Sequence, residues 1–112
     1  MLGGLWEFPG GKKKKSEPIE ETITREIREE TGLSVNLVKP YCKIDHAYTH
    51  FKITLHAYEC HYVSGEATAK SSDEIRWVLF DELHTYPFPK ANIHVIQSIR
   101  ETKELPLLQN IK

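Results

Sequence analysis

The sequence predicts a single α+β domain in which helices cover a β-sheet. Three observations favour this class: an apolar stripe at helical spacing, a long stretch of alternating apolar and polar residues, and a second helical stripe near the end of the chain. The chain has 112 residues, a formal net charge of −1 and 39% hydrophobic residues. These values are typical of a soluble protein with one small core, and we expect one domain over residues 1–112.

The segment before the first helix is expected to be the end of a strand, Leu2 to Phe8, followed by a tight turn and a basic loop. Gly10 and Gly11 in the turn allow the backbone to approach a ligand closely. The loop from Lys12 to Lys15 has two interpretations. It is either a solvated run, or it attracts phosphates, because it lies between the glycine turn and an acidic helix.

The first helix is expected from about Pro18 to Thr31. Pro18 suits the first helical turn, where its missing N–H costs nothing, and Gly32 suits the left-handed position that ends a helix. The apolar residues of this segment recur at helical spacing and form one stripe that faces a core: Ile19, Ile23 and Ile27.

The same helix carries carboxylates beside its apolar stripe. At 100° per residue Glu30 lies nearly on the stripe, Glu26 on its edge and Glu29 beyond Glu26. Because an unpaired buried carboxylate is costly, this placement indicates a role. Carboxylates at this spacing can share a divalent cation, and their hard oxygens suit Mg²⁺ or Mn²⁺ rather than zinc. The alternative is a solvated acidic face in which Arg25 and Arg28 form ion pairs.

Two antiparallel strands are expected after this helix. Residues 51–58 alternate between apolar side chains, expected on the core face, and polar ones, which is the pattern of a half-buried strand. Cys42 to Ala47 is expected to pair with this strand. The connection between the two strands is then made of Tyr48, Thr49 and His50.

The last third of the chain is expected to hold a strand, a helical turn and a helix. Ile75 to Phe80 is expected to form the strand, with Trp77 facing inward, and Asp81 to His84 the turn. Ala91 to Glu101 is expected to form the helix, with the isoleucines on one face. Leu105 to Lys112 has no clear period and is expected to be a loosely packed tail.

The cysteine content and the absence of targeting features bear on the cellular setting. Cys42 and Cys60 are too few and too poorly spaced for a disulfide framework or a zinc site. No apolar run is long enough to span a membrane, and the first residues lack the pattern of a secretory signal. We therefore expect a reduced, cytoplasmic setting and no membrane partner.

The stretch that begins at Gly11 resembles the signature of the Nudix hydrolases, G-x5-E-x7-R-E-U-x-E-E-x-G-U, with the correct spacing at every fixed position. The matching residues are Gly11, Glu17, Arg25, Glu26, Ile27, Glu29, Glu30, Gly32 and Leu33. The resemblance implies a Nudix fold, a mixed β-sheet sandwiched between helices in α/β/α layers. That fold normally has two further strands before the position of Leu2. We therefore expect a domain truncated at its N-terminus, whose open sheet edge allows a homodimer.

The resemblance also implies a reaction and the residues that carry it. Nudix hydrolases cleave nucleoside diphosphates linked to another group, with metal-activated water attacking a phosphorus. The catalytic residues implied are Arg25, Glu26, Glu29 and Glu30, and the metal ligands are Glu26, Glu29, Glu30 and the Gly10 carbonyl, with Mg²⁺ or Mn²⁺ as cofactor. Arg25 is expected to orient the carboxylates, Glu17 to support them and Lys12 to contact phosphates. A further carboxylate of some MutT-type enzymes falls near Ser71, with Asp73 and Glu74 as substitutes.

Two stretches outside the signature resemble particular branches of the family. Tyr86 to Asn92 resembles the loop before the last helix in MutT-type 8-oxo-dGTP pyrophosphatases, whose asparagine bonds the purine; the alternative for Asn92 is a helix N-cap. His46 to Tyr58 is similar to the C-terminal domain of MutY-type A/G-specific adenine glycosylases. In those proteins the positions of Tyr48, Thr49 and His50 approach 8-oxoguanine. The whole chain resembles this C-terminal Nudix domain most.

These resemblances imply two classes of function in oxidised-guanine DNA repair. As an enzyme, the chain hydrolyses an oxidised purine nucleoside triphosphate of the 8-oxo-dGTP type to the monophosphate and pyrophosphate, using Mg²⁺. As a recognition module of an adenine glycosylase, it binds 8-oxoguanine in DNA without hydrolysis. The expected partner is accordingly a nucleoside triphosphate or 8-oxoguanine-containing DNA. The intact signature favours the enzyme, and a Nudix hydrolase of an unrelated nucleotide is the third interpretation.

Overall fold

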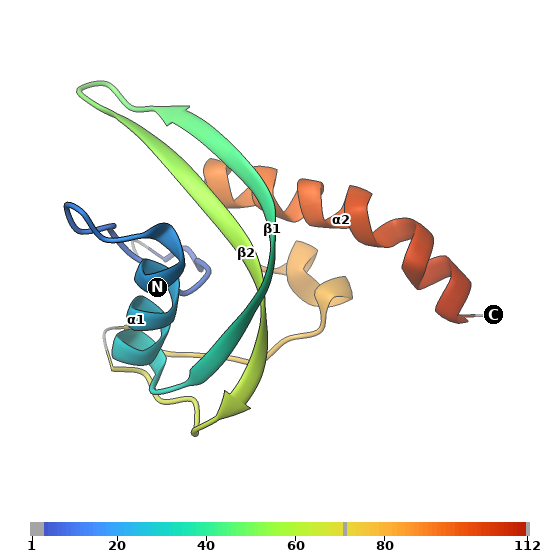
Figure 1. Ribbon diagram of the computed structural model, residues 1–112. Helices are drawn as coiled ribbons and strands as arrows, with labels where there is room; N and C mark the ends of the chain where they lie inside the picture. Colours follow the sequence, from blue (N-terminus) through green and yellow to red (C-terminus); the bar gives the residue numbers. More distant parts are fainter. Residues whose placement is uncertain (1–3, 71, 112) are drawn as a thin grey trace.

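The computed structural model describes the backbone of residues 4–70 and 72–111 and the side chains up to residue 101. The elements of this part of the chain are helix α1 (Ile19–Thr31), strands β1 (Ser34–Ala47) and β2 (Lys52–Ser64), the short 3₁₀ helix η1 (Phe80–Thr85) and helix α2 (Lys90–Ile111). β1 and β2 form a long curved hairpin, and α1 and α2 lie on opposite sides of it (Figure 1). The α+β class and the helix–sheet–helix layering expected from the sequence are therefore confirmed.

Helix α1 begins and ends where its sequence punctuation predicts. Pro18 precedes it with extended backbone angles, φ −62° and ψ 147°. Gly32 follows it in the left-handed region at φ 77°, and its N–H donates to the Arg28 carbonyl at 2.9 Å. A glycine is favoured there because it has no Cβ to clash in this conformation. Ile27 is buried, as the apolar stripe requires.

Strands β1 and β2 pair antiparallel in the predicted way. Their register runs from Ala47 opposite Lys52, next to the turn, to Ser34 opposite Ser64 at the far end. β1 is longer than expected, because it continues through residues 34–41 across irregularities on both sides of Pro40, a residue that has no N–H to donate to a partner.

The alternation predicted along β2 is confirmed at the start of the strand. Ile53 and Leu55 are half-buried, whereas Lys52 and Thr54 are exposed. The expectation that Phe51 faces the core is wrong. Its side chain is 58% exposed, because Phe51 lies in the turn before β2, where the pleat does not set its direction.

The expectations of a third strand and of a mixed sheet are wrong for the described residues. Residues 74–79 form neither helix nor strand, so the sheet of the described chain has only β1 and β2, paired antiparallel. Trp77 is 69% exposed, and its ring meets that of Tyr62 edge-on at 6.3 Å. A segment outside a ladder has no neighbouring strand to set its pleat, so the alternation in its sequence did not direct Trp77 inward.

The N-terminal segment and the end of the chain also differ from the expectation. Leu5 makes an isolated bridge rather than part of a strand, the Trp6 N–H donates to the Pro87 carbonyl at 2.8 Å, and Leu2 lies outside the described residues. Helix α2 continues to Ile111, so the expected tail is helical up to that residue. Lys112 is outside the described part.

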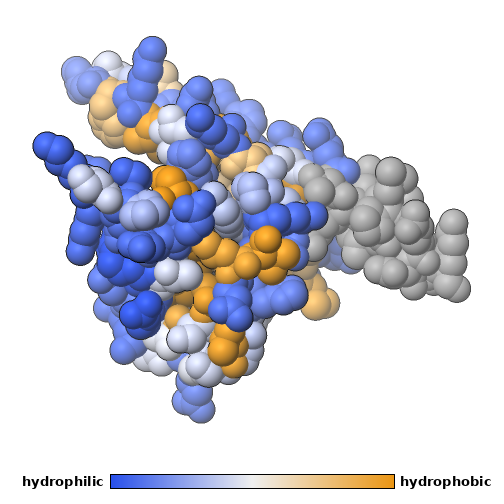
Figure 2. Space-filling view, in the orientation of Figure 1, coloured by the Kyte–Doolittle hydropathy of each residue, from blue (hydrophilic) through white to orange (hydrophobic). Residues whose placement is uncertain are grey.

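The buried face of α2 is shifted from the one predicted. Ile96 is buried as expected, but its neighbours in the core are Ala91 and Val95, whereas Ile93 is 43% exposed. The buried apolar residues of the described chain come from α1, the residue after Gly32, η1 and α2, and they are Ile27, Leu33, Leu83, Ala91, Val95 and Ile96. Figure 2 shows hydrophobic residues exposed between hydrophilic ones on one face. Among the described residues, no helix combines the length and apolarity needed to cross a membrane.

Candidate active site

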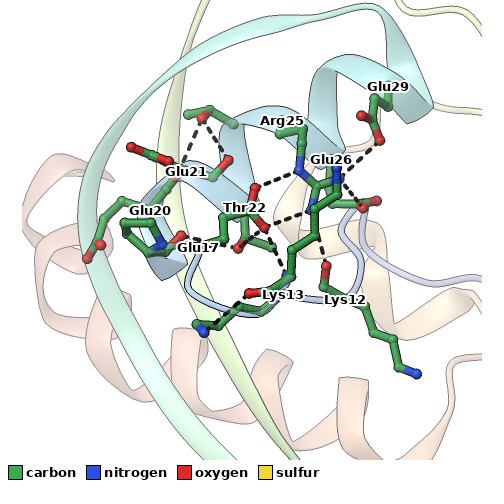
Figure 3. Close-up of polar contacts among 12 residues, drawn as sticks. Lys12, Lys13, Glu17, Glu20, Glu21, Thr22, Arg25, Glu26 and Glu29 are labelled. Atoms are coloured by element: carbon green, nitrogen blue, oxygen red, sulfur yellow. Dashed lines mark hydrogen bonds and ion pairs between the residues drawn. The ribbon is translucent and has the colours of Figure 1, made fainter.

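The Arg25 guanidinium is the centre of the site. Its Nε donates to Oε2 of Glu17 at 2.7 Å, and its Nη1 donates to Oε1 of Glu26 at 2.7 Å and to Oε2 of Glu29 at 3.1 Å (Figure 3). Nη2 donates to Oε1 of Glu17 at 2.9 Å and to the Lys12 carbonyl at 3.2 Å. The planar fork of an arginine allows these contacts at once. One cation of α1 therefore holds carboxylates of the helix and the preceding loop together.

The Glu17 carboxylate fixes the loop to the start of α1. Besides Arg25, its Oε1 accepts the Lys14 N–H at 3.0 Å and the Thr22 hydroxyl at 2.8 Å. Arg25 first, and then the Lys14 N–H and Thr22, hold the pKa of the Glu17 carboxyl well below its usual range. The two partners are coupled, since Glu17 and Glu26 raise the pKa of Arg25. Glu17 is therefore ionised throughout the neutral range.

The glycine turn closes against two carboxylates of α1. The Gly10 N–H donates to Oε1 of Glu30 at 2.7 Å. The Glu26 carboxylate lies directly against Gly11 and occupies the place that a Cβ on Gly11 would take. Burial raises the pKa of the Glu30 carboxyl, the Gly10 N–H opposes this rise, and the charge of Glu26 adds to it. A side chain at Gly11 would therefore have to displace the Glu26 carboxylate.

Gly11→Ala is expected to destabilise the protein by about 1 kcal/mol, because its Cβ displaces the end of the Glu26 side chain and breaks the hydrogen bond between Glu26 and Arg25. Urea denaturation measures this change in the free energy of unfolding. The control is the same substitution in a Glu26→Ala background, where the overlap is gone and the cost should be close to zero. An equal cost in both backgrounds would refute the contact between Gly11 and Glu26 as its cause.

The remaining residues expected to bind substrate lie outside this cluster. The Lys12 side chain points away from the carboxylates, and only its carbonyl oxygen contacts Arg25 (Figure 3). Tyr48, Thr49 and His50 are exposed in the turn of the hairpin, which projects from the body of the molecule (Figure 1). Tyr48 stacks on Phe51 at 4.7 Å. Within the described chain, no hydrogen bond or ring contact joins these turn residues to the carboxylates.

Asn92 lies in the first turn of α2 and not at its N-cap, because the helix begins at Lys90. The alternative of a cap is therefore wrong. Its Oδ1 accepts the Phe8 N–H at 3.2 Å, and the Phe8 ring stacks on that of Phe88 at 5.4 Å. Phe8 is two residues before Gly10, so this contact joins the start of α2 to the segment that enters the glycine turn.

The carboxylates have the chemistry of a divalent-cation site but not its closed geometry. Glu26, Glu29 and Glu30 offer hard oxygens on one border of a helix, and the pKa of Glu30 is raised first by burial and then by the nearby charge of Glu26. In the described residues, no group of three acidic, histidine or cysteine side chains is close enough to hold a metal ion. Arg25 and Gly10 draw the carboxylate oxygens toward themselves, so holding a cation requires these side chains to turn.

The substitutes expected for a further carboxylate do not reach the cluster either. Oε2 of Glu74 pairs with Nη2 of Arg76 at 2.6 Å, and both side chains are about half exposed. Asp73 is exposed and belongs to no metal-binding group among the described residues. Ser71, the position expected to correspond to this ligand, lies outside the described residues.

Two contacts of the site are absent from the sequence-based expectation. The Phe8–Asn92 hydrogen bond joins residues 84 positions apart, and no local pattern indicates it. The buried Thr22 hydroxyl was missed although a signal existed. At 100° per residue, Thr22 lies at an angle between those of Glu26 and Glu29 around the helix axis, so it shares their face. The Glu17 carboxylate contacts the same face.

The chain is similar to known proteins over most of its length. A family model described as NUDIX domain matches residues 1–98. The chain is 32% identical over 97 residues to the 8-oxo-dGTP diphosphatase of Buchnera aphidicola subsp. Schizaphis graminum, covering 87% of this chain and 73% of that protein. It is similar to the crystal structure of the MutT NUDIX hydrolase from Burkholderia pseudomallei, with a TM-score of 0.76 and 30% identity, covering 86% of this chain and 78% of that one. It is also similar to the solution structure of the E. coli ORF135 protein, with a TM-score of 0.78 and 27% identity, covering 89% of this chain and 71% of that one.

Proposed function

The chain belongs to the NUDIX domain family, and from this premise we propose that it is a MutT-type pyrophosphohydrolase. Its substrate is an oxidised purine nucleoside triphosphate of the 8-oxo-dGTP type, and its products are the monophosphate and pyrophosphate. The observation that carries the proposal is the Arg25 guanidinium holding Glu17, Glu26 and Glu29 beside the glycine turn. The similarity to 8-oxo-dGTP diphosphatases supports the substrate class.

The residues of α1 have distinct roles in this proposal. Glu26, Glu29 and Glu30, with the Gly10 carbonyl, would hold a divalent cation, for which Mg²⁺ and Mn²⁺ suit the oxygen ligands. When bound, such a cation neutralises phosphate charge and lowers the pKa of the attacking water. Arg25 keeps the carboxylates oriented. The exposed Lys12 ammonium attracts the phosphates of the incoming nucleotide.

The base is assigned to the contact between Asn92 and Phe8. An amide side chain carries N–H donors and an oxygen with two lone pairs. The Phe8 N–H occupies one lone pair of the Asn92 Oδ1 and so fixes the amide, which leaves the other lone pair and the amide N–H groups for the base. 8-Oxoguanine presents an N7–H donor where guanine presents an N7 acceptor, so these groups can tell the two bases apart. The Phe8 ring, stacked on Phe88, offers an apolar surface next to them.

Asn92→Ala is expected to reduce the preference for 8-oxo-dGTP over dGTP on the order of tenfold. A buried donor or acceptor left unpaired costs roughly 1–3 kcal/mol, and in the wild type this cost falls on only one of the two bases. Without the amide, the two bases would no longer differ in the hydrogen bonds that they make at this position. Steady-state kinetics with the two nucleotides measure the ratio of kcat/KM. Gln97→Ala, which removes an exposed amide side chain of α2, is the matched control and should keep the ratio. A wild-type protein that treats both nucleotides alike would contradict the assignment.

Recognition of 8-oxoguanine in DNA is the second candidate, and the exposed stack of Tyr48 on Phe51 at the hairpin turn supports it. In that case, binding to a duplex with an A·8-oxoguanine pair would depend on Thr49 and His50, and the protein would not turn over 8-oxo-dGTP.

Two further parts of the proposal concern the cellular location and the oligomeric state. The unbridged Cys42 and Cys60 support a reduced, cytoplasmic location. The exposed apolar side chains Tyr62 and Val63 of β2, with Trp77 next to Tyr62, support homodimer formation.

A further inference from the structure

Thr22 is a buried polar side chain on the side of α1 that faces Glu17. Its exposed fraction is 4%, and its Oγ1 lies 2.8 Å from Oε1 of Glu17 and 3.2 Å from the Pro18 carbonyl oxygen. The hydroxyl has one proton to donate. The Pro18 carbonyl already accepts the Thr22 N–H at 3.0 Å, whereas Glu17 is ionised, and charge-assisted hydrogen bonds are the stronger ones. The Thr22 proton therefore goes to Glu17.

The Thr22 hydroxyl ties the position of Glu17 to the helix. The other bonds to this carboxylate come from Lys14, in an exposed loop, and from Arg25, whose long side chain has many rotamers. Thr22 is different, because its β-branched side chain is stiff at χ1 and is enclosed at the start of α1. It is thus the partner of Glu17 whose own position is best fixed by the fold.

We propose that Thr22 is a positioning residue for the active site, acting through Glu17 and Arg25. The Thr22 hydroxyl donates to Glu17, and Glu17 accepts from both Nε and Nη2 of Arg25. Nη1 of Arg25 is thereby directed at Glu26 and Glu29. Losing the hydroxyl loosens Glu17 and lets the guanidinium rotate away from the carboxylates of the helix. The Nudix signature does not specify the residue at this position. The inference rests on the proposed function for its kinetic part.

A simpler role for Thr22 is the back-bonding of a helical hydroxyl to its own backbone. Thr24 has that role alone, since its Oγ1 contacts the Glu20 carbonyl at 3.3 Å and the Glu21 carbonyl at 3.2 Å. Both residues lie in the first two turns of α1 and have the same side chain. Thr24→Val is therefore the matched control, because it removes a helical hydroxyl without removing a bond to a carboxylate.

The experiment compares Thr22→Val, Thr22→Ser and Thr24→Val by two measurements. The first is the hydrogen-exchange rate of the Arg25 Nε–Hε group by NMR, which reports how firmly Glu17 holds the guanidinium. The second is kcat and KM for 8-oxo-dGTP with Mg²⁺. Thr22→Val should exchange about tenfold faster and lose about tenfold in kcat, as for other residues that orient metal ligands, with KM nearly unchanged. Thr22→Ser and Thr24→Val should resemble the wild type in both measurements.

Two outcomes would overturn the inference. One is an Arg25 exchange rate in Thr22→Val equal to that in Thr24→Val, and the other is a kcat that falls equally in Thr22→Val and Thr22→Ser. If Thr22→Val does not fold, Thr22→Ala and Thr22→Ser replace it, since both lack the methyl group and differ by the hydroxyl. A wild type that does not hydrolyse 8-oxo-dGTP would refute the proposed function, whereas the exchange rates would still decide the role of Thr22.

Discussion

Glu30→Gln is expected to lower the turnover of 8-oxo-dGTP by about 10²–10⁴-fold, the usual contribution of a positioned catalytic carboxylate, while leaving the fold intact. The amide oxygen of glutamine can still accept the Gly10 N–H, which Oε1 of Glu30 accepts at 2.7 Å. The substitution therefore keeps the shape of the site and removes its negative charge. In the proposed mechanism, that charge helps to hold a divalent cation beside the glycine turn.

The control for this prediction is Glu21→Gln, on the exposed side of the same helix and outside the Arg25 contacts. Calorimetric titration with Mn²⁺ should show weakened binding for Glu30→Gln and wild-type binding for Glu21→Gln. Equal turnover of the two variants would remove Glu30 from the mechanism.

The raised pKa of Glu30 gives the titration with Mn²⁺ a second readout. Burial raises this pKa, and a protonated carboxyl cannot bind a cation. On acidification, Mn²⁺ affinity of the wild type should therefore begin to fall at a pH above the ordinary range for a glutamate. Glu30→Gln should lack this part of the pH dependence.

The features that the sequence predicted correctly are those fixed by neighbouring residues. Pro18 and Gly32 place the ends of α1, because one lacks an N–H and the other tolerates a left-handed backbone, and both effects act within a turn. The ion pair between Arg25 and Glu29 also follows from their spacing, since residues four apart share a helix face. The core of the candidate site was thus accessible from sequence alone.

The errors occurred where a distant partner decides the outcome. Trp77 alternates with its neighbours as in a strand, but no ladder in the described chain imposes that geometry on it. α2 buries Ala91 and Val95 and leaves Ile93 exposed, because the rotation of a helix is set by what it packs against and not by its most apolar residues. The Asn92–Phe8 bond likewise depends on how α2 docks against the N-terminal segment.

Arg25→Gln is expected to lower turnover by about 100-fold, because one residue then ceases to orient the carboxylates around the reacting phosphates. Glutamine is too short and too poor in donors to reach Glu17, Glu26 and Glu29 together. Arg25→Lys should recover only part of the loss, since an ammonium is a point charge and lacks the planar fork. Arg28→Gln, at an exposed position of the last turn, removes the same charge from α1 and should retain full turnover.

The free energy of unfolding of Arg25→Gln should also depend on pH in a way that reports the contact between Arg25 and Glu17. In the wild type the pKa of Glu17 is held below its unfolded value by Arg25, so the contact stabilises the folded state above the unfolded pKa and is lost on acidification. Without Arg25 the carboxylates repel one another, and protonating them relieves the repulsion. The deficit in urea midpoint relative to the wild type should therefore be largest near neutral pH and shrink as the pH falls. A deficit that is independent of pH, or turnover equal to that of Arg28→Gln, would show that these carboxylates keep their places without the guanidinium.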